Sequence, residues 1–126
     1  MIQSLFSFLS YLGTAVALLA VFIWLYEKFT PYHEFQLMKQ NNSAAAVTLS
    51  GAMLGFTLPM VSSIYYTQSL AEMTLWSLVT GIVQFVFFVA MHRWAKHIEN
   101  GQVAPAIFVA SGSVAVGLLN AVSISH

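Results

Sequence analysis

Few side chains in this sequence could do chemistry, and they are scattered along the chain. His92 and His97 are five residues apart, a spacing that puts them on different faces of a helix. Glu72 has no other acidic residue near it in the sequence. The sequence holds no nucleophile elbow, phosphate-binding loop or zinc-ligand spacing, and it has no cysteine. We therefore expect a protein that is not an enzyme and that holds no cofactor and no metal.

Two amide side chains, Gln84 and Asn120, lie inside long apolar segments that contain no Asp, Glu, Lys, Arg or His. In hydrocarbon an amide gains by bonding to a neighbouring helix, and such bonds contribute about 0.6–2 kcal/mol each. We expect both amides to join helices. The alternative is that they line a pore, above all if several chains assemble around an axis. Ion pumps and voltage sensors are disfavoured because they need ionisable groups at this depth.

Most of the chain is too apolar for a water-soluble domain. Of 126 residues, 59% are hydrophobic and 6% are charged, whereas a soluble domain has about 25% charged residues. A helix needs about 20 apolar residues to cross the hydrocarbon of a bilayer, and its backbone amides must be paired internally. Four segments meet this length, at residues 4–26, 44–66, 73–91 and 103–124. The sequence predicts an all-α, multi-pass membrane protein with a single domain over residues 1–126.

Charge placement predicts the orientation of the four helices. All four basic residues lie between the first and second or the third and fourth segments: Lys28, Lys39, Arg93 and Lys96. Because basic loops stay in the cytoplasm, both termini are expected outside. We expect the first segment to be retained, since a signal peptide would begin with positive charge and residues 1–9 have none. The net charge of zero and the lack of a basic patch exclude disorder and nucleic-acid binding.

The chain resembles itself at an offset of 60 residues. Ala44 aligns with Ala104, Leu58 with Leu118 and Ser63 with Ser123. Two tandem helical hairpins are therefore predicted, over residues 4–66 and 73–124. Since each copy crosses the membrane twice, the copies share one orientation and form a parallel duplication. The alternative is chance similarity between apolar segments.

Small residues recur at helical spacing in the second and fourth segments, and the sharpest are Gly51, Gly55, Ser113 and Gly117. Small side chains at this spacing let two membrane helices approach until their backbones touch. The first and third segments carry the bulky aromatic residues instead. We expect the second and fourth helices to form an inner pair, and the first and third to face lipid.

Polar residues precede the two inner helices. Asn41, Asn42 and Ser43 come before the second helix, and Asn100 comes before the fourth. Such side chains cap helix N-termini by accepting hydrogen bonds from free amides. The alternative is that the two N-termini together bind an anion such as a phosphate or a lipid headgroup.

The basic loops offer a second kind of surface. Residues 31–40 are amphipathic and are expected to form a short helix in the membrane interface. Lys39, Arg93 and Lys96 are the cations that could dock a cytoplasmic partner.

The residues around both loops resemble those of a known family. The run TPYHEFQLMKQNNSAA from Thr30, followed by Ser50-Gly51 and Leu54-Gly55, resembles the YjfL-like small inner-membrane proteins, called domain of unknown function 350. The second copy, IENGQVAPA from Ile98, resembles the second half of that family, although Gln102 stands where Asn is more usual. The resemblance implies a bacterial inner-membrane protein with four helices and a duplicated hairpin. It implies no reaction, and the family's gene neighbourhoods suggest a role in envelope stress.

Taken together, these patterns predict a homo-oligomeric module of the bacterial inner membrane, because one chain with two thin hairpins has little interior of its own. The module would support envelope maintenance and dock a cytoplasmic or membrane protein through its loops. The alternative is a small ion or solute channel or transporter whose pathway is lined by the second and fourth helices.

Overall fold

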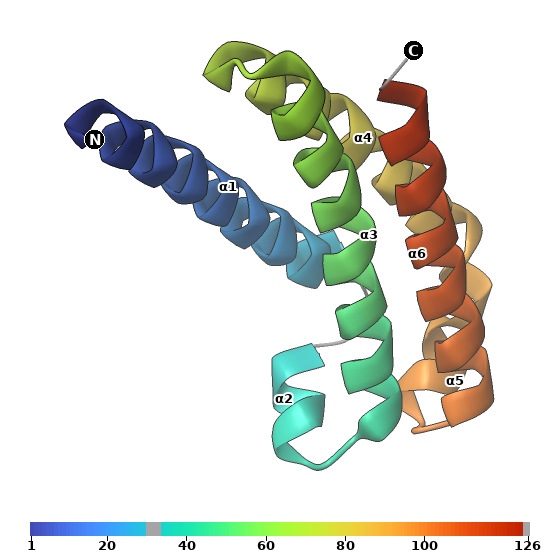
Figure 1. The fold of residues 1–126 in the computed structure, drawn as a ribbon. Coiled ribbons are helices and arrows are strands. Elements are labelled where there is room, and N and C mark those ends of the chain that lie inside the picture. The colour runs from blue at the N-terminus through green and yellow to red at the C-terminus, as the bar shows by residue number, and fades with distance from the viewer. Residues whose placement is uncertain (30–33, 125–126) are drawn as a thin grey trace.

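The computed structural model describes residues 1–29 and 34–124, and within these residues the protein is entirely helical, with no strand (Figure 1). The elements in chain order are α1 (Ile2–Phe29), α2 (Glu34–Lys39), α3 (Ser43–Thr67), α4 (Leu70–Ala90), η1 (His92–Trp94), α5 (Ala95–Glu99) and α6 (Val103–Ile124). The four long helices are each long and apolar enough to cross a membrane. This confirms the predicted all-α class and the four spans.

The connections between the long helices alternate between a short helix and a tight turn. The short helices α2 and α5 lie at the same end of the molecule, and the α3–α4 turn lies at the other (Figure 1). That turn needs only Gln68, which takes a left-handed conformation with φ 51°, and Ser69, whose hydroxyl caps α4. The order long helix, short helix, long helix therefore occurs twice.

Helix α3 is the centre of the bundle. It packs along α6 for much of its length and also contacts α4 and α1 (Figure 1). The extensive α3–α6 pairing agrees with the expected inner pair. The expectation that the third span faces lipid was wrong in part, because α4 buries a larger share of its residues than α6 does. The reason is that α4 packs against three neighbours (α1, α3 and α6), and a stripe of its residues is enclosed between them.

Helix α1 is attached to the bundle mainly through its second half. Phe22 stacks on Phe56 of α3, with 4.1 Å between ring centroids, and Tyr26 meets the edge of Phe88 on α4 at 4.9 Å. The first half of α1 points away from the other helices (Figure 1), and residues such as Phe6 are exposed. The aromatic cluster therefore anchors α1 near the end that carries the short helices.

Candidate functional site

The predicted packing glycines lie where α3 and α6 touch. A Cβ atom on Gly51 would lie 2.5 Å from the Cα of Ala110, and one on Gly117 would lie 2.7 Å from the Cα of Gly55. No real Cβ sits that close to another carbon, so only glycine fits at these two positions. We call this contact between α3 and α6 the seam. Its backbones touch, so within the described chain the seam leaves no pathway between the small-residue faces of the two helices.

Gln84 of α4 reaches the middle of the seam. Its Nε2 donates a hydrogen bond to the backbone oxygen of Ser113 at 3.0 Å, and the Ser113 hydroxyl donates to Gln84 Oε1 at 2.9 Å. Both residues are 0% exposed. Gly55 makes room for the amide, because a Cβ there would lie 2.7 Å from Nε2. The pair thus joins α3, α4 and α6 at one point, and in the single chain it is enclosed and lines no pore.

Asn120 differs from Gln84. Its Nδ2 is buried and has no hydrogen-bond partner, so the hydrogen bond predicted between helices is not made through this nitrogen. The polar link at this end of the seam is made one residue further on, where the Ser62 hydroxyl donates to the backbone oxygen of Ala121 at 2.6 Å. A buried amide with an unpaired N–H costs about 1–3 kcal/mol.

Of the polar residues predicted to cap α3, one makes the capping hydrogen bond. Asn42 is the N-cap of α3: its Oδ1 accepts from the backbone N–H of Ala45 at 3.1 Å. Asn41, just before it, takes a left-handed φ of 63°, and Ser43 is the first residue of the helix. Because the Asn42 side chain occupies the first turn, an anion would have to displace it.

The expected role of Asn100 was wrong. It is the C-cap of α5, not the N-cap of α6, and its backbone N–H donates to Lys96 O at 3.1 Å. The reason is that α5 occupies residues 95–99, and Gly101 (φ 84°) and Gln102 still have to turn the chain before α6 begins at Val103. The N-cap of α3 is instead linked to the end of α5, since Asn42 Nδ2 donates to Glu99 O at 3.2 Å.

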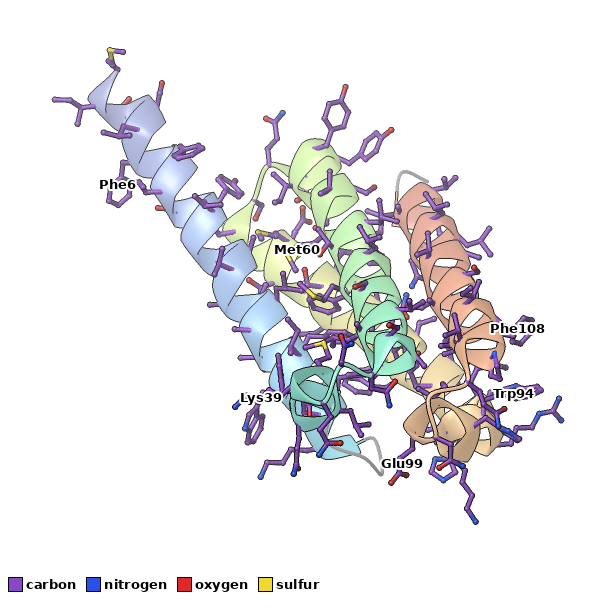
Figure 2. The ribbon with its side chains drawn as sticks, turned by 90° about the horizontal axis from the view of Figure 1, so that it is seen from below. Phe6, Lys39, Met60, Trp94, Glu99 and Phe108 are labelled. Atoms are coloured by element: carbon purple, nitrogen blue, oxygen red, sulfur yellow. The ribbon has the colours of Figure 1, made fainter. Side chains whose placement is uncertain are left out.

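The three cations predicted to dock a partner come from α2, η1 and α5, which we call the basic platform (residues 34–39 and 92–99). Lys39, Arg93 and Lys96 are all exposed. Lys39, Trp94 and Glu99 lie at the same end of the molecule in Figure 2. The platform rests on the bundle, because Ile98 is only 2% exposed. It can therefore present positive charge from a fixed surface.

The comparisons with known proteins agree on one family. A family model described as Domain of Unknown Function (DUF350) matches residues 1–124. The UPF0719 inner membrane protein YjfL of Escherichia coli K12 is 30% identical over 124 residues, which cover 95% of this chain and 94% of that protein. The chain belongs to the DUF350 family. The protein of the same name from Escherichia coli O157:H7 matches equally well, and no solved structure matches.

As a DUF350 member with four spanning helices, the chain is a multi-pass protein of the bacterial inner membrane, as the sequence predicted. No group of three or more His, Cys, Asp or Glu residues among the described residues could hold a metal ion. Two groups of predicted site residues lie together in this DUF350 structure: the Gln84–Ser113 pair in the seam, and the cations of the basic platform.

A buried polar stripe on α4 escaped the sequence analysis. Ser77, Thr80, Gly81 and Gln84 are all buried and follow one another at helical spacing. The signal was present, because small and polar residues at positions i, i+3, i+4 and i+7 mark a packed face in a membrane helix. It was hidden by the bulky phenylalanines on the rest of this segment.

Proposed function

We propose that this DUF350 protein is a non-enzymatic, homo-oligomeric module that supports envelope maintenance and docks cytoplasmic or membrane partners through the basic platform. One observation carries the docking part: the platform is fixed to the bundle while its cations stay exposed. Ile98 anchors α5, Leu37 and Met38 of α2 pack against the core, and the Asn42–Glu99 bond links the two loops. The envelope role rests on what the family resemblance implies.

The placement of charge supports an orientation with both termini outside. All four Lys and Arg residues belong to the end of the bundle that carries α2 and α5, and the α3–α4 turn has none. By the rule that basic loops stay inside, the platform then faces the cytoplasm. The twice-repeated element order supports a tandem duplication with one shared orientation.

The exposure of α1 supports assembly with further copies. Its second half supplies most of its packing within the chain, and its first half exposes large apolar side chains, Phe6 and Phe8 among them. Membrane helices gain packing energy when an exposed surface of this kind packs against another protein surface. A second copy of this chain could cover the exposed half of α1, because other copies are present in the same membrane.

Charge reversal tests the docking proposal. In cells that express a tagged chain, we expect Lys39→Glu together with Lys96→Glu to remove the proteins that co-purify after crosslinking, because both side chains are exposed on the platform. The matched control is Glu72→Lys, which changes charge at the opposite end of the bundle. Recovery of the same partners from both variants would contradict the proposal.

Orientation and assembly have separate tests. The chain has no cysteine, so a single Cys at Gln68 should react with an impermeant thiol reagent from the periplasm, and one at Gln40 should not. The opposite pattern would reverse the orientation. For assembly, native mass spectrometry of protein released from nanodiscs should give a multiple of 13.9 kDa, and a mass of one chain would refute the oligomer.

A further inference from the structure

A groove lies on the outer side of α6, where that helix begins beside η1. Its volume is about 320 Å³, and it is lined by Trp94 of η1 and by Ala104, Pro105 and Phe108 of α6. The ring of Trp94 meets that of Phe108 edge-on, with 6.2 Å between the ring centroids. Phe108 is 58% exposed and points outward (Figure 2), so the groove faces away from the seam. We call it the Trp94 groove.

One end of the Trp94 groove carries a positive charge. The guanidinium carbon of Arg93 lies 5.1 Å from the centroid of the Trp94 ring, a cation–π contact that holds the charge beside the groove. Arg93 is exposed, and it forms no salt bridge with any of residues 1–29 and 34–124. A similar contact joins Lys28 to Trp24 at 5.0 Å, but there Glu27, the next residue in the chain, offsets the charge. The charge of Arg93 therefore stays available to an anion.

The Trp94 groove changes from polar to apolar along the direction of the membrane normal. Trp94 comes four residues after the end of α4 at Ala90, and Phe108 lies five residues inside α6, about 8 Å deeper along the helix. Tryptophan and basic residues at the ends of membrane helices lie at the level of the lipid headgroups. The groove thus begins at headgroup level beside a cation and continues along an apolar wall into the hydrocarbon.

This arrangement matches the chemistry of an anionic phospholipid. A guanidinium binds phosphate oxygens in a bidentate manner, and the phosphate of a phospholipid lies at the level of the Trp94 ring. The volume of 320 Å³ is about twice that of the 150 Å³ cavities that accept benzene, so the groove has room for part of an acyl chain. A zwitterionic lipid fits less well, because its ammonium group brings a second positive charge close to Arg93.

We propose that the Trp94 groove binds one anionic phospholipid, with its phosphate on the Arg93 guanidinium and one acyl chain along Phe108. The inference rests on the proposed docking function of the basic platform and deepens it, because it assigns a membrane lipid as the partner of the Arg93 side. Lys39 belongs to the other side of the platform, as Figure 2 shows, with Glu99 between it and Trp94. The two sides can therefore be tested separately.

Phosphatidylglycerol that is brominated on its acyl chains is the probe, because bromine quenches tryptophan at short range. The full chain with Trp24→Phe and Trp76→Phe keeps Trp94 as its single tryptophan. It is reconstituted in nanodiscs of phosphatidylcholine, and brominated phosphatidylglycerol replaces a rising fraction of the lipid. A parallel series uses brominated phosphatidylcholine. We expect phosphatidylglycerol to be enriched at Trp94 about fivefold, the contribution of one basic residue near an anionic lipid surface.

Two matched charge variants separate a local site from the general field of the platform. Arg93→Gln should abolish the enrichment, because it removes the cation that contacts the Trp94 ring. Lys39→Gln removes the same charge from the other side of the platform and should leave the enrichment unchanged. Since the nanodiscs contain no other protein, this result is independent of the crosslinking test of protein docking, and either test can fail without the other.

A third variant tests the acyl-chain part of the site. Ala104 lines the groove and is exposed, so Ala104→Phe fills the space without burying a new group in the bundle, and it should abolish the enrichment while Arg93 is kept. Equal quenching by the two brominated lipids, an equal loss in Arg93→Gln and Lys39→Gln, or full enrichment in Ala104→Phe would overturn the proposal. Displacement of phosphatidylglycerol by inorganic phosphate would also overturn it, because the site would then bind a free anion.

Discussion

Replacing Gly55 with alanine tests how tightly the seam is closed. The new Cβ would lie 2.5 Å from both the backbone oxygen and the hydroxyl of Ser113, and 2.7 Å from Gln84 Nε2. All three atoms belong to the backbone or to buried hydrogen-bonding groups, so none of them can move without cost. The substitution therefore forces α3 and α6 apart and breaks the amide pair at the same time.

The expected loss can be worked out from its parts. Overpacking costs about 1–3 kcal/mol. The two hydrogen bonds between Gln84 and Ser113 are worth about 0.6 kcal/mol each in a membrane protein. Alanine recovers up to about 1 kcal/mol because it is the better helix former. The net loss in the free energy of unfolding is then about 1–3 kcal/mol.

The measurement is reversible unfolding by sodium dodecyl sulfate in mixed micelles, followed by circular dichroism. Gly13→Ala is the matched control, because Gly13 also lies within a long helix but has nothing within 4 Å of its missing Cβ. Gly13→Ala should be neutral or stabilising by up to about 1 kcal/mol. If Gly55→Ala unfolds no more easily than Gly13→Ala, the backbones of the seam are not in contact and the reasoning is refuted.

Three further substitutions can be followed in the same unfolding assay. Gln84→Leu should destabilise by about 1–2 kcal/mol, because it leaves the buried Ser113 hydroxyl without its acceptor; an unchanged midpoint would mean that the pair is not made. Asn120→Leu should stabilise by about 1 kcal/mol, since it removes an amide nitrogen that is buried without a partner, and a loss of stability would show that Asn120 is paired in the membrane. Asn42→Ala should cost about 1 kcal/mol through the lost cap of α3, whereas Asn42→Ser, which keeps a capping oxygen, should recover most of it.

The spans and the seam could be predicted from the sequence because their causes are local. Apolar length defines a membrane helix, and Gly51 and Gly55 at helical spacing define a surface that another backbone can approach. The partner surface was also visible, since Ser113 and Gly117 repeat the pattern in the fourth span.

The remaining features depend on three-dimensional neighbours that spacing does not specify. Gln84 and Asn120 look alike in the sequence, yet Gln84 bonds a carbonyl and a hydroxyl of α6, whereas the Nδ2 of Asn120 has no hydrogen-bond partner. Asn100 could not be assigned to the end of α5, because that helix has five residues and no periodicity to recognise. The enclosure of α4 was missed for another reason: its packed face is a stripe of small and polar residues, and the bulky phenylalanines of the same segment drew the interpretation toward a lipid-facing helix.

The length of α1 relates the shape of the protein to the thickness of its host membrane. Its 28 residues extend about 42 Å, against a hydrocarbon layer of about 30 Å, whereas the 21 residues of α4 nearly match that layer. An overlong helix relieves this hydrophobic mismatch by tilting, and α1 is held by the bundle at one end only. A thinner bilayer therefore lays α1 flatter and a thicker one draws it upright, so the width of the gap between α1 and α4 follows the composition of the surrounding lipid.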